Sequence, residues 1–228
     1  MVARQAHNLE VACSSPASAT RLPETPLHRV SGFLVSLHRT IQKKARQMID
    51  EILTYNQQFV AAKDYERYTT DKYPDKRLAV LSCMDTRLTE LLPAALGLRN
   101  GDAKIIKNAG GLVIAPFDSA MRSLIVAVYE LGVQEIMVVA HSGCGACHMS
   151  YDHFHHQMLE RGVTDTTLDT IRKCGIDLNT WLEGFRDTPE SVRRTVTTIK
   201  THPLMPTDII VRGFIIDSTT GELQEIPV

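Results

Sequence analysis

Two short polar motifs, each directly after an apolar run, constrain the fold of this chain most strongly. The first, CMDTR at residues 83–87, follows the run LAVL, and the second, HSGC at residues 141–144, follows the run IMVVA. Apolar runs of this length are typical of buried strands in a parallel sheet. Because the carboxyl ends of parallel strands lie at one edge of the sheet, the two motifs are expected to meet there.

The pattern around these motifs predicts an α/β domain. Strands are expected at about 77–83, 104–107, 135–140 and 208–217, helices at 88–96 and from Asp118 to Leu131, an interrupted helical region from Gly145 to near Ile199, and a C-terminal hairpin formed with residues 223–226. Alternating strands and helices imply right-handed crossovers and a parallel sheet. We therefore expect three layers, with a central four-to-five-stranded, mostly parallel sheet flanked by helices and closed by the hairpin at its edge.

The first 47 residues differ from the rest of the chain. They carry seven Lys and Arg against two Asp and Glu, and residues 1–31 are rich in Ala, Ser, Pro and Arg without sustained periodicity. This composition predicts a disordered or targeting-like tail, with translation begun upstream of the true start as the alternative. Apolar residues keep a helical period over about 34–62, so the tail is expected to run into a helix. The single domain is predicted to span residues 48–228.

Bulk composition narrows the class of function. A hydrophobic content of 43% and a charged content of 22% are typical of soluble globular proteins, and the net charge of -1 favours neither nucleic acid nor an anionic membrane as partner. No apolar stretch approaches the length of a membrane span. Five cysteines in 228 residues are better explained as ligands or buried thiols than as a disulfide framework. We therefore predict a cytoplasmic protein, with organellar targeting by the tail left open.

Cys83, His141 and Cys144 form a predicted metal site. Two thiolates and an imidazole suit zinc, and three protein ligands leave a fourth position for water, as in catalytic sites. Asp85 is expected on the same side of the extended segment as Cys83, where its carboxylate could accept a hydrogen bond from that water. Arg87 would hold the carboxylate ionised. The same closeness would let Asp85 become the fourth ligand in a closed, inactive state.

Other interpretations of these residues remain. Cys144 and Cys147 form a C-x-x-C, so a closed structural zinc site that adds Cys147, one turn into the next helix, is the main rival. A thioredoxin-type redox pair would leave Cys83 and His141 unused. His148, His153, His155 and His156 could relay a proton, but a solvated helix face explains them better.

Taken together, the motifs resemble those of the beta-class carbonic anhydrases, in their compact bacterial and archaeal branch, over roughly residues 48–228. The resemblance rests on C-x-D-x-R, H-x-x-C, the NAGG loop at 108–111 and the strand and turn at 213–221. It implies one zinc ion per subunit, bound by Cys83, His141 and Cys144, with Asp85 and Arg87 orienting the nucleophile. The implied reaction is reversible hydration of carbon dioxide to bicarbonate by attack of zinc-hydroxide.

The resemblance also implies assembly into a homodimer or a dimer of dimers, with the helix at 48–62 packed on the partner. Two other functions stay open. The same fold could hydrolyse carbonyl sulfide or carbon disulfide, or the chain could be a zinc-bearing homologue without catalytic activity. Gly110 and Gly111 permit a tight turn at positive φ. We also expect them to approach the substrate closely beside the metal.

Overall fold

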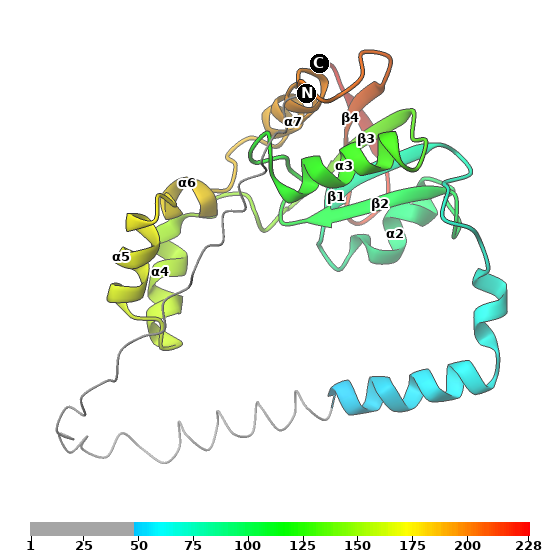
Figure 1. Ribbon diagram of the computed structural model, residues 1–228, viewed down its shortest axis with the longest axis horizontal. Coiled ribbons are helices and arrows are strands. Elements are labelled where there is room, and N and C mark those ends of the chain that lie inside the picture. The colour runs from blue at the N-terminus through cyan, green and yellow to red at the C-terminus, as the bar shows by residue number, and fades with distance from the viewer. Residues whose placement is uncertain (1–47) are drawn as a thin grey trace, which may run out of the picture. The chain divides into compact units, whose positions relative to one another are not determined.

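The computed structural model describes residues 48–228 (Figure 1). The predicted tail, and the first part of the helix expected over 34–62, lie outside the described residues. A helix occupies residues 48–61, and the short 3-10 helix η1 spans Asp64–Tyr68. The chain divides into two compact units between Tyr65 and Glu66. The paragraphs that follow concern the second unit, residues 66–228.

A five-stranded sheet forms the centre of this unit, as predicted. Its strands are β1 (Leu78–Cys83), β2 (Ala103–Asn108), β3 (Glu135–His141), β4 (Ile210–Ile216) and β5 (Leu223–Ile226). The order across the sheet is β2-β1-β3-β4-β5, in which the first four strands are parallel and β5 pairs antiparallel with β4. The predicted parallel sheet and the predicted C-terminal edge hairpin are both confirmed.

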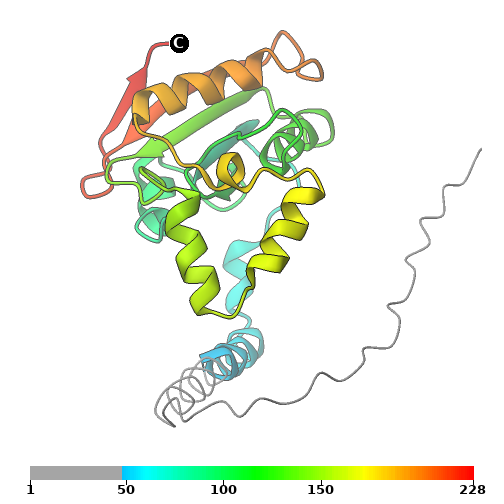
Figure 2. The ribbon, with the colours of Figure 1, turned by 90° about the vertical axis from the view of Figure 1, so that its left-hand side faces the viewer.

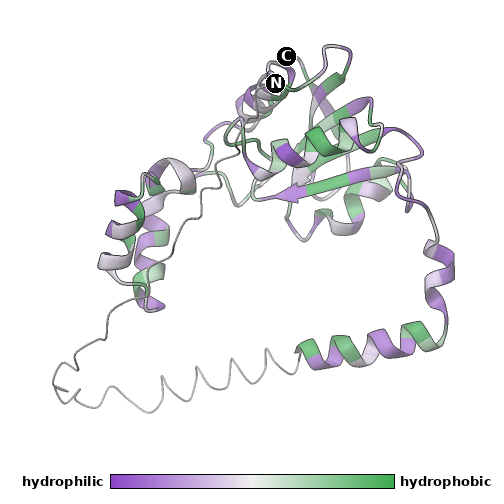
Figure 3. Ribbon diagram, in the orientation of Figure 1, coloured by the Kyte–Doolittle hydropathy of each residue, from purple (hydrophilic) through white to green (hydrophobic). Residues whose placement is uncertain are grey.

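Helices cover both faces of the sheet and complete three layers. The helices of this unit are α2 (Leu88–Ala95), α3 (Ser119–Tyr129), α4 (Tyr151–Glu160), α5 (Asp165–Lys173), α6 (Leu178–Leu182) and α7 (Thr188–Lys200), and those that cover the sheet are α2, α3 and α7. Apolar side chains of α3 and α7 pack with one face of the strands, and those of α2 pack with the other. Figure 3 shows the resulting concentration of hydrophobic residues in the central strands. Within residues 48–228, each helix is too short or too polar to cross a bilayer.

Local signals in the sequence account for where the two main helices begin. The Asp118 carboxylate accepts a hydrogen bond from the Met121 N–H at 2.8 Å and caps α3, as predicted. Asp187 caps α7 in the same way through the Glu190 N–H at 2.7 Å, with proline in the first turn. These two helices place the apolar layer that supports β1 and β3.

The predicted helical region after Cys144 is wrong at its start. Residues 145–150 form turns and an isolated bridge at Cys147 rather than a helix, and the first helix begins at Tyr151. The backbone here pairs with a distant segment instead, because the His148 N–H donates to the Phe185 carbonyl and the Gly184 N–H donates to the Met149 carbonyl, both at 3.0 Å. Cys147 therefore lies in a turn rather than on a helix.

Helices α4, α5 and α6 form a small group with its own apolar cluster. Tyr151, Leu168 and Leu178 are its buried centre. Figure 2 shows α4 and α5 extending away from the sheet layer. The group is joined to the sheet through the pairing of residues 146–149 with residues 184–185, directly after the second motif.

Gly111 lies where the loop after β2 passes against the backbone of β1. Its φ is +68°, and a Cβ at this position would be 2.8 Å from the Cys83 nitrogen and 2.9 Å from the Ser82 carbonyl carbon. Only glycine fits, because both the left-handed backbone and the space exclude a side chain. This close approach brings the NAGG loop directly beside the end of β1.

We expect Gly111→Ala to lower the free energy of unfolding by about 3 kcal/mol, of which about 1 kcal/mol is backbone strain and the rest is steric overlap. Gly132→Ala is the matched control, because its φ is +69° but nothing lies within 4 Å of the added Cβ. That variant should lose about 1 kcal/mol. Urea denaturation measures both, and equal losses would contradict the close approach.

Candidate metal centre

The three predicted ligands meet at the carboxyl edge of the sheet. Cys83 is the last residue of β1, His141 is the last residue of β3, and Cys144 follows a tight turn after β3. All three side chains are buried, and their donor atoms lie within 4.8 Å of one another. The two Sγ atoms are 3.7 Å apart and both thiols are free. The parallel pairing of β1 with β3 thus creates a group that could hold a metal ion.

His141 presents an unsatisfied nitrogen to this group. Its ring is fully buried, and Nδ1 lies 2.9 Å from the Ser142 carbonyl oxygen. A carbonyl oxygen can only accept, so Nδ1 carries a hydrogen, and in the neutral ring Nε2 keeps a free lone pair. Nε2 has no hydrogen bond to oxygen or nitrogen among residues 48–228. Because a buried polar atom without a partner is unfavourable, this nitrogen fits a metal ligand.

The two thiols differ in their electrostatic surroundings. Burial opposes ionisation of Cys83, but hydrogen bonds from the protonated His141 ring and from the backbone N–H groups of Asp85 and Gly110 outweigh it and lower the pKa of Cys83 to about 7. Burial raises the pKa of Cys144 to about 11, despite a hydrogen bond from the Ala146 backbone. A metal ion that binds both as thiolates must therefore displace a proton from Cys144.

Asp85 and Arg87 form a bidentate ion pair beside the sulfurs. Arg87 Nε donates to Asp85 Oδ1 at 3.0 Å, and Nη2 donates to Oδ2 at 2.8 Å. These hydrogen bonds hold the pKa of the Asp85 carboxyl well below its usual range. Oδ2 also lies 3.8 Å from His141 Nε2, so the carboxylate stands at the edge of the donor group. The closed state with Asp85 as fourth ligand stays a prediction.

The loop after β2 is held closed by an asparagine. Asn108 Nδ2 donates to the Leu112 carbonyl at 2.7 Å, and the Leu112 N–H donates to Asn108 Oδ1 at 3.0 Å. The loop therefore directs the Gly110 N–H toward the Cys83 sulfur. Gly110 and Gly111 are thus placed next to a ligand, and their contact with substrate stays a prediction.

Cys147 is not part of the donor group found among residues 48–228. Its backbone pairs with Phe185, and its Sγ lies 4.0 Å from the Arg186 carbonyl oxygen. The geometry favours the three-ligand set over the four-ligand structural site. On α4, His155 pairs with Asp165 at 3.1 Å and His156 pairs with Glu160 at 3.2 Å, as expected of a solvated helix face.

Two serines near the site escaped sequence reasoning. Arg87 Nη1 donates to Ser218 Oγ at 3.1 Å, and the Ser218 N–H donates to Ser142 Oγ at 3.0 Å. Ser218 lies in the turn after β4, 131 residues from Arg87 in the chain. A serine in a polar turn gives no indication in the sequence that it contacts Arg87, because the fold alone brings the two residues together.

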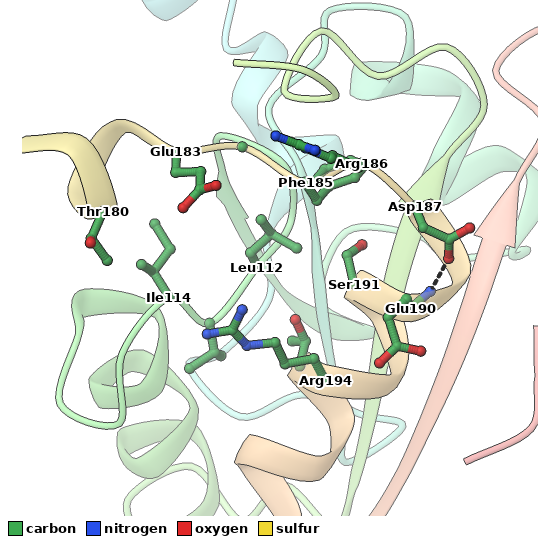
Figure 4. Close-up of a pocket in the computed structure, with 13 residues that line it drawn as sticks. Leu112, Ile114, Thr180, Glu183, Phe185, Arg186, Asp187, Glu190, Ser191 and Arg194 are labelled. Carbon is green, nitrogen blue, oxygen red and sulfur yellow. Dashed lines mark hydrogen bonds between the residues drawn. The ribbon is translucent and has the colours of Figure 1, made fainter. Parts of the chain in front are cut away.

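A cavity of about 370 Å³ lies elsewhere in this unit. It is lined by residues of the segments 112–114, 180–187 and 190–195, and Figure 4 shows Leu112, Ile114 and Arg194 around it. The three donor residues are not among those that line it. The cavity therefore belongs to the face between the NAGG loop and α7 rather than to the metal centre.

The fold and site define a metal-binding α/β protein whose donors, two cysteines and a histidine, stand beside an Asp–Arg pair. Residues 78–223 match the family model for carbonic anhydrase, and the chain belongs to this family. It is 48% identical to the Bacillus subtilis protein YvdA, provisionally named a carbonic anhydrase, over 178 residues covering 78% of this chain and 90% of that one.

Two other relatives extend the comparison. A carbon disulfide hydrolase of Saccharolobus solfataricus is 31% identical over 163 residues, covering 66% of this chain and 78% of that one. The crystal structure of a beta-carbonic anhydrase from Trichomonas vaginalis matches with a TM-score of 0.71 and 32% identity, over 78% of this chain and 96% of that one. The resemblance to beta-class carbonic anhydrases is thereby confirmed.

Substitution of each donor should abolish metal binding. We expect Cys83→Ser, His141→Ala and Cys144→Ser to retain almost no zinc after dialysis, because two remaining ligands hold the ion weakly. Cys147→Ser is the matched control, three residues from Cys144, and should keep one zinc ion per chain. Elemental analysis of the purified proteins measures this. Loss of zinc from Cys147→Ser would support the four-ligand site instead.

Proposed function

We propose that this protein is a zinc enzyme that catalyses the reversible hydration of carbon dioxide to bicarbonate. The observation that carries the proposal is the buried group of Cys83, His141 and Cys144 with the Asp85–Arg87 pair at its edge. Membership of the carbonic anhydrase family supports it. A purely structural metal site has no use for an ion pair directed at its open side, so the pair favours catalysis.

Zinc suits the donor set. Two thiolates at about 2.3 Å from a tetrahedral ion lie about 3.8 Å apart, close to the 3.7 Å separation of the two sulfurs. The unsatisfied Nε2 of His141 supplies a third donor. A zinc ion bound here would act as a Lewis acid that lowers the pKa of a water molecule at the fourth position.

The protein groups around that position would orient the attacking oxygen. Asp85 Oδ2 faces the donors, and as an ionised carboxylate it can accept a hydrogen bond from the attacking water or hydroxide. Arg87 fixes both carboxylate oxygens, so Asp85 presents a lone pair in one direction. The backbone N–H of Gly110 stabilises the Cys83 thiolate.

A second candidate substrate is carbon disulfide or carbonyl sulfide. It is favoured by the relatives named carbon disulfide hydrolase, at 31–32% identity. These molecules are linear like carbon dioxide, and the same donors and Asp–Arg pair would serve their hydrolysis. A zinc-bearing homologue without activity is the third possibility, which the intact pair opposes. Cytoplasmic location and a single domain over residues 48–228 stay predictions.

We further propose that a second copy of this chain covers the helix at 48–61. Its apolar side chains are exposed over much of their surface; Ile49 and Ile52 are each 60% exposed. Exposed apolar groups in such number are typical of association surfaces. The helix alternates hydrophobic and hydrophilic residues along its length (Figure 3).

Asp85→Asn should reduce the rate of carbon dioxide hydration at least about 100-fold, because the amide cannot replace the oriented carboxylate as acceptor on both oxygens. Stopped-flow measurements between about pH 6.5 and about pH 9 test this. Since the Asp85 carboxyl stays ionised throughout that range, the rise of the wild-type rate with pH should follow the ionisation of the zinc-bound water.

Asp169→Asn is the matched control for this measurement. Asp169 also pairs with an arginine, Arg172, at 2.8 Å, but on the exposed surface of α5. The control should keep the wild-type rate. A zinc-loaded wild type that hydrates no carbon dioxide but hydrolyses carbon disulfide would replace the proposed substrate with the second candidate.

Ile52→Glu should convert the protein from a dimer or larger assembly to a monomer at micromolar concentration, because it places a charge in the apolar face. Thr54→Glu adds the same charge to the opposite face of the helix and serves as control. Light scattering after gel filtration compares each mass with the 25.4 kDa chain. A monomeric wild type would contradict the proposed assembly.

A further inference from the structure

Ser218 occupies a junction between the ion pair and the histidine ligand. It lies in the turn after β4 and is 8% exposed. Its Oγ accepts a hydrogen bond from Arg87 Nη1 at 3.1 Å and donates one to the Ser142 carbonyl at 3.1 Å. The carbonyl can only accept, so the direction of the hydroxyl hydrogen is determined.

The Ser142 carbonyl receives a second hydrogen bond on the same oxygen. His141 Nδ1–H donates to it at 2.9 Å. A carbonyl oxygen has two lone pairs and can serve both donors. The ring that supplies a metal ligand and the hydroxyl that holds Arg87 therefore share one acceptor.

The turn that carries Ser218 is itself braced. Asp217 Oδ1 accepts hydrogen bonds from the Thr219 and Thr220 N–H groups, both at 2.8 Å. The Ser218 N–H donates to Ser142 Oγ at 3.0 Å. Because its backbone is anchored on both sides, the Ser218 hydroxyl has a defined position relative to β3.

Arg87 makes four hydrogen bonds with its five N–H donors. Two reach Asp85, one reaches the Gly143 carbonyl at 3.0 Å and one reaches Ser218. The side chain is 47% exposed, so the pair with Asp85 alone would leave the guanidinium free to move with the carboxylate. Ser218 is the contact that ties its Nη1 end to the turn after β4.

We propose that Ser218 is a positioning residue, whose hydroxyl holds Arg87, and through it Asp85, in register with the His141 ligand. The inference rests on the proposed function for its effect on catalysis. The restraint of the Arg87 side chain by the Ser218 hydroxyl does not depend on which substrate the enzyme uses.

The test compares zinc-loaded wild type, Ser218→Ala, Ser218→Thr and Thr219→Ala. Thr219 is the adjacent, exposed hydroxyl residue, so its variant controls for loss of a hydroxyl from the same turn. Carbon dioxide hydration gives kcat and KM. Nitrogen-15 NMR follows the Nε–Hε signal of Arg87, assigned by its absence in Arg87→Lys, and its rate of hydrogen exchange with water.

In Ser218→Ala we expect kcat to fall about fivefold to tenfold with KM within about twofold, because the nucleophile's orientation changes and substrate binding does not. Exchange at Arg87 Hε should accelerate several-fold. The melting temperature should fall by no more than about 4 °C. Ser218→Thr, which keeps a hydroxyl, should restore both readouts, and Thr219→Ala should match the wild type.

Unchanged exchange at Arg87 in Ser218→Ala would overturn the inference, whatever the activity. A loss of kcat that is equal in Ser218→Thr and Ser218→Ala would also overturn the role of the hydroxyl. A wild type without carbon dioxide hydration would count against the proposed function alone. In that case faster exchange at Arg87 in Ser218→Ala, restored in Ser218→Thr, would still support the restraint.

Discussion

The parallel pairing of β1 with β3 is the constraint on which the rest of this structure depends. The register sets Ser82 opposite Val139, so the next residue of β1, Cys83, and the last residue of β3, His141, reach the same edge of the sheet. Neither strand could shift by one residue without moving its buried side chains to the wrong face. The apolar layers that hold α2, α3 and α7 on the sheet therefore also hold the metal donors in place.

Charge in the site is balanced by groups from several elements. The two thiolates would neutralise the double positive charge of a zinc ion. The Asp85–Arg87 pair adds one negative and one positive charge, so the site as a whole stays neutral. Arg87 is the N-cap residue between β1 and α2, and its other partners, Gly143 and Ser218, follow β3 and β4. The Asp85–Arg87 pair is therefore held in place by residues that follow three strands, β1, β3 and β4, and not by the contact between its two members alone.

Sequence reasoning was sufficient for the sheet and the two main helices, and it named five residues that the structure brings together at one edge of the sheet; their roles stay predictions. Their signals are short-range: apolar runs that end in Cys83 and His141, and an aspartate cap at Asp118. It failed for residues 145–150, because their backbone pairs with Gly184 and Phe185 instead of forming a helix. It also missed Ser218, whose contacts with Ser142 and Arg87 span 76 and 131 residues. Such contacts follow from the fold and leave no local pattern.

X-ray absorption at the zinc edge of the loaded protein tests the central claim most directly, because it counts the sulfur neighbours of the metal. A site of Cys83, His141 and Cys144 with an open fourth position predicts two sulfur atoms at about 2.3 Å and two nitrogen or oxygen atoms at about 2.0–2.1 Å. Three sulfur atoms would place Cys147 on the metal. That result would contradict the account of an open, catalytic centre.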